Sequence, residues 1–341
     1  MIKCPLDLHQ ITPLTRTQIE HLARLAGDFE SRILFECDNR VINGKSMLGL
    51  LSLGATGHEQ VMMTVEGPDE EEAAREMKAL LDSGVIAPKN AADAESLMQR
   101  VKRRYEEILQ DSLAGIYLHG SLAAGCFQWK RSDIDFLVVV REKPDIRAKM
   151  ALAEALYALR EEAPPAGFEM SVILEKYCRN TPYPVPFELH YSNAHLQAYQ
   201  EDPRGFCQRM HGEDPDLTAH FLCLRAYGMT LQGPSIMRMF APVRREDALR
   251  AILEDANGAR AHFGERPCYY VLNLCRALAY KRENLVLNKR DGGEWALENL
   301  DQAHQRVIQA ALNAYQAGRD MSYDAGLAES FCFEALKELN G

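Results

Sequence analysis

The feature that most constrains the fold is a pair of aspartates, Asp133 and Asp135, at the head of an apolar run that ends at Val140. Such a run predicts a buried strand. Alternate side chains on a strand share a face, so the two carboxylates project together and Ile134 and Phe136 point the other way. Like charges this close are costly unless a cation lies between them, and oxygen ligands suit magnesium. The sequence therefore predicts a metal site.

Gly120 and Ser121 end a second apolar run, and a stretch of small residues follows them. A strand followed by the start of a helix is expected there. Glycine lets a backbone approach a phosphate closely, and a serine hydroxyl with free N–H groups at a helix start can hold phosphate oxygens. Phosphoryl transfer needs little beyond positioning and charge neutralisation, which two metal ions can supply. The motif therefore indicates phosphoryl-transfer chemistry.

A third carboxylate is expected on a neighbouring strand. The segment 167–174 predicts that strand, and Glu169 is its only carboxylate before Glu175. Glu169 could bind the metal or accept the proton of an attacking hydroxyl, because a carboxylate is an adequate base when a metal favours the alkoxide. We prefer the base role. The alternative is a solvent-facing glutamate at a sheet edge.

Glycine-serine followed by Asp-x-Asp at the head of a strand resembles the signature of the nucleotidyltransferase fold that includes DNA polymerase beta. The resemblance implies that Asp133 and Asp135 bind magnesium. It also implies nucleotide contacts from three residues: Gly120, Ser121 and Ser132. The alternative interpretation is that the two aspartates cap a turn.

The chain from Asp214 to its end is expected to be mainly helical, because apolar residues recur there at helical spacing. Residues 113 to about 320 resemble the bacterial aminoglycoside adenylyltransferases that modify streptomycin and spectinomycin. The segments that carry the resemblance are 168–172, 216–217, 231–234, 271–276, 288–291 and 295–297. The resemblance implies a two-domain arrangement with the substrate between the domains.

Carried over residue by residue, the resemblance implies these roles: metal ligands Asp133 and Asp135, base Glu169, and nucleotide contacts Lys289 and Tyr315. The lysine also fits the chemistry, because a triphosphate needs cationic partners beyond magnesium. Tyr315 is explained equally well as a core residue. The family lines its antibiotic site with tryptophans, whereas residues 180–184 contain none. The resemblance therefore leaves the acceptor open.

The first 87 residues read as short alternating helices and strands. They resemble the HPr phosphocarrier domain, most clearly in 44–54 and 66–73. That family carries its phosphate on a histidine in a G-L-H-A-R-P motif, and here the histidine and arginine positions are Thr15 and Thr17. Because threonine cannot form a labile phosphoimidazole, phosphotransfer through this domain is not expected.

Ser46 stands where many HPr proteins have a regulatory phosphorylation site. A phosphate at this position would lie at a helix N-terminus, where free N–H groups stabilise it. The alternative is that Ser46 only caps the helix.

The chain is expected to be a multidomain α/β (α+β) protein. The predicted parts are an HPr-like open-faced β-sandwich (1–87), a linker and connecting helix (88–112), a polymerase-beta-like nucleotidyltransferase domain (113–205) and a C-terminal helical bundle (206–341). The bundle is expected to cap the active site.

The net charge of −10 leaves no excess of basic residues to neutralise a phosphate backbone, so nucleic-acid binding is disfavoured. No apolar run is long enough to span a membrane and the first ten residues lack a secretion signal, so we expect a cytoplasmic protein.

The predicted reaction is magnesium-dependent transfer of a nucleotidyl group, adenylyl in the simplest case, from ATP to a hydroxyl of a small molecule, with pyrophosphate release. An aminoglycoside is one candidate acceptor. The alternative is a regulatory protein in which a degenerate HPr-like domain binds a protein partner and is coupled to a nucleotide-binding module.

Overall fold

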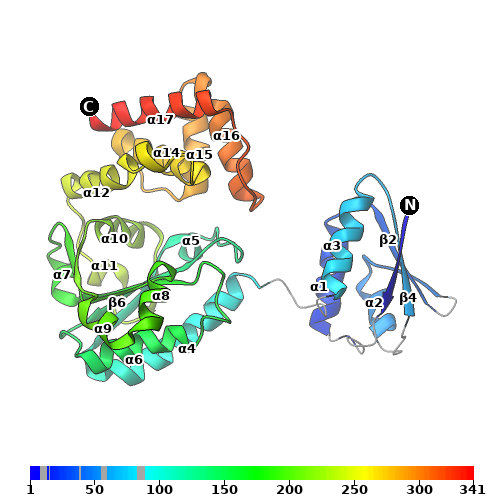
Figure 1. Ribbon diagram of the computed structural model, residues 1–341, viewed down its shortest axis with the longest axis horizontal. Helices are drawn as coiled ribbons and strands as arrows, with labels where there is room; N and C mark the ends of the chain where they lie inside the picture. The colour runs from blue at the N-terminus through cyan, green and yellow to red at the C-terminus, as the bar shows by residue number, and fades with distance from the viewer. Residues whose placement is uncertain (8–13, 15, 38–39, 55–59, 83–88) are drawn as a thin grey trace. The chain divides into compact units, whose positions relative to one another are not determined.

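The computed structural model describes residues 1–7, 14, 16–37, 40–54, 60–82 and 89–341. The chain forms two compact units, Met1–Pro88 and Lys89–Gly341 (Figure 1). Thr15, at the expected histidine position, and Pro88, where the linker was expected to begin, lie outside the described residues.

The first unit is a four-stranded antiparallel sheet with helices on one face. Its strands, in the order β1-β4-β2-β3, are β1 (Ile2–Asp7), β4 (Gln60–Glu66), β2 (Arg32–Cys37) and β3 (Arg40–Asn43). Its helices are α1 (Arg16–Gly27), α2 (Met47–Gly54) and α3 (Glu70–Asp82). Burial alternates along β2, so one face of the sheet packs against the helices, as an open-faced sandwich requires. Strand β1 was not predicted from the sequence.

Helix α2 begins at a serine cap. The Ser46 hydroxyl accepts the Gly49 N–H at 3.2 Å, and the Ser46 carbonyl accepts the Leu50 N–H at 2.9 Å. The helix leaves Leu48 81% exposed, with Met47 and Leu51 also exposed. Ser46 therefore lies at the edge of an apolar surface.

The second unit is built on a five-stranded mixed sheet in the order β11-β5-β6-β7-β9. The strands are β5 (Leu113–Leu118), β6 (Ile134–Val140), β7 (Phe168–Leu174), β9 (Leu189–Tyr191) and β11 (Met229–Gln232). Strands β6 and β7 are parallel and the other pairs are antiparallel. A separate two-stranded sheet joins β8 (Val185–Phe187) to β10 (Gly212–Asp214). The expected mixed α/β multidomain fold is confirmed.

Both faces of the central strands are covered (Figure 1). The helices on one face are α4 (Ala91–Leu109), α6 (Ile146–Tyr157), α8 (Leu196–Glu201) and α9 (Pro203–Arg209), and those on the other are α7 (Glu175–Arg179), α10 (Asp216–Tyr227) and α11 (Ile236–Met239). Phe136 and Val138 of β6 enter the first core, and Leu137 and Val139 enter the second. Strand β6 is thus nearly continuous in apolar residues because it is buried on both sides.

A helical layer follows, formed by α12 (Arg245–Asn257), α13 (Ala259–His262), α14 (Pro267–Glu283), α15 (Lys289–Asn299), α16 (Gln302–Gln316) and α17 (Ala325–Asn340). These helices share a core of their own. The region after Asp214 is not wholly helical, because β11 returns to the sheet and pairs with β5. Within the described ranges, no helix is both long enough and apolar enough to cross a membrane.

We expect Phe136→Ala to destabilise the second unit by about 3–5 kcal/mol, because its buried ring packs between Tyr105 and Phe168 and its removal leaves a cavity. Urea unfolding followed by tryptophan fluorescence measures this, since both tryptophans, Trp129 and Trp295, belong to this unit. As a control, Phe333→Ala, which removes an exposed ring of α17, should stay within about 0.5 kcal/mol. Equal effects of the two variants would contradict the packing described.

Candidate active site

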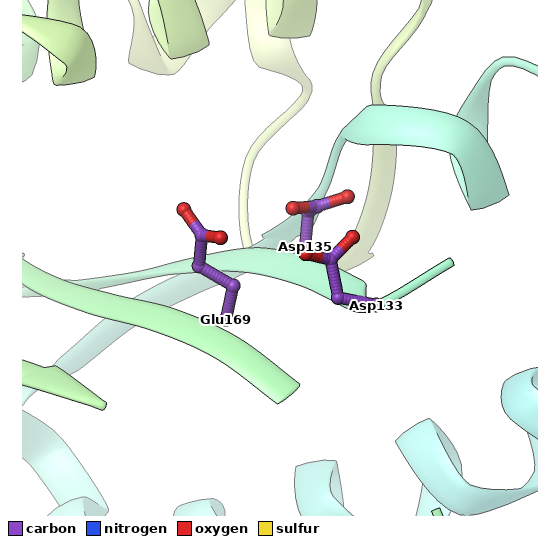
Figure 2. Close-up of side chains that lie close together, drawn as sticks. All are labelled: Asp133, Asp135 and Glu169. Carbon is purple, nitrogen blue, oxygen red and sulfur yellow. The ribbon is translucent and has the colours of Figure 1, made fainter. Parts of the chain in front are cut away.

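Three carboxylates meet at the start of β6 and β7. The parallel register places Asp135 directly opposite Glu169, and Asp133 immediately precedes β6. One ligand oxygen from each residue lies within 4.8 Å of the others, and Figure 2 shows the side chains projecting to the same side of the strands. The third carboxylate therefore comes from the neighbouring strand.

The cluster is electrostatically unfavourable in the absence of a cation. Burial raises the pKa of Asp135 well above its ordinary value, and the charges of Asp133 and Glu169 add to the effect. Burial also raises the pKa of Glu169. A divalent cation would relieve this repulsion. Among the described residues, this is the one group of three or more carboxylate, histidine or cysteine side chains that fits a metal ion.

Gly120 makes room for one of these carboxylates. Its φ of +61° lies in the left-handed region, and a Cβ atom there would overlap the Asp135 carboxylate. The preceding residue, His119, donates its backbone N–H to the Asp135 carbonyl at 3.1 Å. The turn at the start of α5 (Gly120–Ala123) is therefore packed tightly against β6, which gives this glycine a role in the acidic cluster besides any contact with phosphate.

The two serines of the motif differ in their contacts. The Ser121 hydroxyl, at the start of α5, is buried and has no hydrogen-bond partner among the described residues. Such a group normally has a partner, so a ligand oxygen is a natural one. The Ser132 hydroxyl instead accepts the Gln128 N–H at 3.0 Å and fixes the loop before the aspartates. Both serines line the same cavity as the three carboxylates.

That cavity has a volume of about 400 Å³ and lies between the sheet and the helical layer. Lys289, at the start of α15, lines it and places its ammonium 4.6 Å from the Tyr269 ring centroid. Burial and the nearby Arg276 lower the pKa of Lys289, whereas Asp133 and Asp135 act in the opposite direction. The lysine is thus close enough to the acidic cluster to interact with it.

Tyr315, near the end of α16, also lines the cavity. Its hydroxyl contacts the Cys126 sulfur at 3.7 Å, and its carbonyl accepts the Gln128 side-chain amide at 2.7 Å. The tyrosine therefore joins the helical layer to the loop that precedes the aspartates. The structure brings every sequence-predicted residue of the second unit into one cavity.

Several cavity residues were missed by the sequence reasoning. Asp216 and His220 on α10 form a pair with 3.2 Å between Oδ2 and Nε2, and their four-residue spacing on a helix was the available signal. Asp255 on α12 accepts hydrogen bonds from Asn273 at 2.7 Å and Tyr269 at 3.1 Å. The sequence carried no local signal for the group of Asp255, Tyr269 and Asn273, because its members come from two helices, α12 and α14.

Three family models match the chain. The nucleotidyltransferase domain matches residues 97–177, the C-terminal domain of aminoglycoside adenylyltransferase matches 238–338, and the model described as the PTS HPr component phosphorylation site matches 15–83.

Curated relatives match the two units separately. An aminoglycoside (3'') (9) adenylyltransferase of Shigella flexneri is 25% identical over 67% of this chain and 88% of its own length. The HPr-like protein Crh of Bacillus subtilis is 33% identical over 18% of this chain and 71% of its own length. The phosphocarrier protein HPr of Cupriavidus necator is 35% identical over 18% of this chain and 67% of its own.

A solved structure, the spectinomycin adenyltransferase AAD(9) from Enterococcus faecialis with ATP and spectinomycin, superimposes with a TM-score of 0.61 at 18% identity. The alignment covers 72% of this chain and 99% of that one, and it shows a shared fold.

The fold and the matching domain models define an enzyme of the nucleotidyltransferase class. Through its first unit the chain belongs to the HPr family, and its second unit is an adenylyltransferase-like enzyme distantly related to the aminoglycoside adenylyltransferases.

We expect Gly120→Ala to weaken Mn²⁺ binding about tenfold or more, because the new Cβ displaces the Asp135 carboxylate. The matched control is Gly125→Ala, where φ is +70° and a Cβ meets nothing within 4 Å. Both variants should lose about 1–2 kcal/mol of stability from the left-handed backbone. Titration of Mn²⁺ by electron paramagnetic resonance checks this, and equal affinities would contradict the steric argument.

Proposed function

We propose that the second unit transfers an adenylyl group from ATP to a hydroxyl of a small molecule, with magnesium as the metal and pyrophosphate as the second product. The observation that carries the proposal is the half-buried cluster of Asp133, Asp135 and Glu169 at the wall of the cavity. Buried carboxylates with raised pKa values fit divalent cations, and nucleotidyl transfer depends on such charge neutralisation.

In this mechanism, Asp133 and Asp135 would hold magnesium, which would supply positive charge to neutralise the phosphates. Glu169 accepts the proton of the acceptor hydroxyl. The hydroxyl oxygen then forms a bond to the α-phosphorus of ATP, the bond from that phosphorus to the bridging oxygen breaks, and pyrophosphate leaves. The proton stays on Glu169, and the electron pair of the broken bond leaves with pyrophosphate.

The nucleotide is assigned to the side of the cavity that carries Ser121 and Lys289. The unpaired Ser121 hydroxyl can bind a phosphate oxygen, and the Gly120 turn lies next to it. The Lys289 ammonium supplies positive charge to the triphosphate. We assign Tyr315 to the nucleotide too, because its contacts with Cys126 and Gln128 hold it against the loop that follows Ser121. Ser132 acts by holding the loop.

The acceptor is assigned to the side that carries Asp216 and Asp255. Both carboxylates line the cavity, and burial together with the Asp216 charge raises the pKa of Asp255. A cationic group on the acceptor would stabilise the Asp255 carboxylate, so an amino-bearing polyol such as an aminoglycoside is a candidate. Neither tryptophan of the chain lines the cavity. Any aminoglycoside must therefore be held without the aromatic contacts that the resemblance implies.

We expect Mg²⁺-dependent pyrophosphate release from ATP when a panel of streptomycin, spectinomycin and related aminocyclitols is supplied. Asp135→Asn should lower the rate about 10²-fold or more, because it removes a charge on which the metal depends. The matched control is Glu175→Gln, a carboxylate just beyond β7 that pairs with Arg179 outside the cavity. Equal rates for wild type and Asp135→Asn would refute the enzymatic mechanism. If no compound of the panel gives pyrophosphate release although ATP still binds, the result would favour another acceptor or the regulatory alternative.

The regulatory alternative is favoured by the HPr fold of the first unit and by its exposed surface. Thr15 in place of histidine removes the phosphate carrier, yet the HPr fold is kept and the unit displays the apolar surface of Met47, Leu48 and Leu51 beside Ser46. We propose that this unit binds a protein partner and that phosphorylation of Ser46 controls the interaction. A phosphate at the N-terminus of α2 would be favoured by the free N–H groups.

We expect an HPr serine kinase to add one phosphoryl group to the intact chain, detected by mass spectrometry. Ser46→Ala should remove the modification, and Ser52→Ala on the same helix should retain it. Absence of label on the wild-type chain, or label that persists in Ser46→Ala, would exclude this site.

A further inference from the structure

A second cavity lies against β7, on the face of that strand opposite to the acidic cluster. Its volume is about 520 Å³, within the range of about 300–1,000 Å³ that is usual for small-molecule sites. Phe168 lines this second cavity and Glu169 lines the first, because successive side chains of a strand point to opposite faces. The described residues that line the two cavities are all different. The second cavity is therefore separate from the candidate active site.

A buried tyrosine offers an unpaired hydroxyl to the second cavity. Tyr191, on β9, lines the cavity and is 2% exposed. Within the described ranges, its hydroxyl has no hydrogen-bond partner. Burial raises the pKa of Tyr191 to about 12, although the Arg160 charge acts in the opposite direction, so the hydroxyl keeps its proton at neutral pH. Buried hydroxyls normally have a partner, and an acceptor atom of an occupant would supply one.

Aromatic contacts hold Arg160 near this hydroxyl. The Arg160 guanidinium lies 4.1 Å from the Tyr157 ring centroid and donates to the Tyr157 carbonyl at 2.9 Å. Tyr157 and Tyr191 both pack against Tyr199, with 5.4 and 5.9 Å between ring centroids. Arg160 is also the charged group with the largest influence on the pKa of Tyr191. The guanidinium and the hydroxyl therefore lie close together at the cavity that both residues line.

A second cation and a second neutral donor belong to the same lining. Lys89 donates to the Glu162 carbonyl at 2.7 Å, and its ammonium lies 4.9 Å from the Trp129 ring centroid. In the described part of the chain, the Lys89 ammonium has no carboxylate partner and the Trp129 indole N–H has no acceptor. Among the described lining residues, the one carboxylate is that of Glu161, which pairs with Arg160 at 3.4 Å but is 81% exposed. Because such surface pairs are weak, the cavity carries positive charge that the protein itself does not neutralise.

We propose that the second cavity binds the phosphate monoester of a small organic molecule, with the phosphate against Arg160 and the Tyr191 hydroxyl and with Lys89 adding positive charge. A phosphate monoester carries a charge of about −1.5 to −2 at neutral pH and three strong acceptor oxygens, which match two cations and a neutral donor. A carboxylate carries a single charge and two oxygens, so it would leave more of these groups unused. The surfaces of Phe168 and Trp129 remain for the organic part of the molecule. This site goes beyond the proposed transfer reaction and does not depend on it.

Binding of phenyl phosphate to the full chain tests the proposal, with benzoate as the matched carboxylate. Trp295→Phe leaves Trp129 as the only tryptophan and thus as a fluorescent reporter at the second cavity, and isothermal titration calorimetry measures the same affinity independently. Saturating nonhydrolysable ATP analogue and magnesium keep both probes out of the first cavity. We expect saturable binding of phenyl phosphate, about tenfold tighter than binding of benzoate, because hydrogen bonds to the additional charge contribute to it.

Two variants test the assigned contacts. Tyr191→Phe removes only the hydroxyl and Arg160→Gln removes a charge, and each should weaken the binding of phenyl phosphate about tenfold. The matched controls are Tyr177→Phe on α7 and Arg147→Gln on α6, which lie outside the cavity lining and should bind as the unsubstituted chain does. Melting temperatures verify that the variants fold.

Three results would overturn the proposal: no saturable binding of phenyl phosphate, benzoate binding as tightly as phenyl phosphate, or unchanged affinity in either Tyr191→Phe or Arg160→Gln. Equal losses of affinity in the site variants and their matched controls would also overturn it, because the effect would not then arise at this cavity. None of these results bears on pyrophosphate release, so the proposed function is tested separately.

Discussion

The parallel pairing of β6 with β7 is the constraint on which the site depends. Its register sets Asp135 opposite Glu169, and the strands are buried on both faces. A shift by one residue would exchange the side chains that enter the two cores, so the register is strongly fixed. Asp135 and Glu169 therefore stay opposite each other, because β6 and β7 cannot slide past one another. Core packing thereby holds like charges together and creates a place for a cation.

The second wall of the cavity supplies what the sheet lacks. The strands and the α5 turn contribute carboxylates and a buried hydroxyl, and the helical layer contributes Lys289, Arg276 and Tyr315. The bond from the Gln128 side-chain amide to the Tyr315 carbonyl and the contact of the Tyr315 hydroxyl with the Cys126 sulfur join the two walls directly. Because each wall holds only part of the chemistry, the site exists only where the sheet and the helices meet.

The first unit has its own hydrophobic core, so its fold does not depend on the enzyme. The HPr family model matches residues 15–83, which include α2 and α3. The unit thus has the fold of a phosphocarrier domain. A unit of this kind is suited to recognition through surface residues such as Leu48 and Ser46.

Much of the architecture could be predicted from local sequence. The apolar run after Asp135, the carboxylate Glu169 and the glycine-serine turn each follow from strand periodicity and turn chemistry, which are local properties. The sequence also indicated Lys289 and Tyr315, but only through family resemblance. Strand β11 was missed because its four residues lie at a sheet edge, none of them is buried, and so short a segment carries little periodicity.

The sequence alone determined which residues could form the acidic cluster and that the chain has a nucleotidyltransferase signature. Only the tertiary structure decided that a side chain at position 120 would overlap the Asp135 carboxylate, and that His220 and Asp255 face the same cavity. The physical reason is distance along the chain: β6, α10 and α12 are separated by many residues, and only packing of the helices against the sheet sets their side chains against one another.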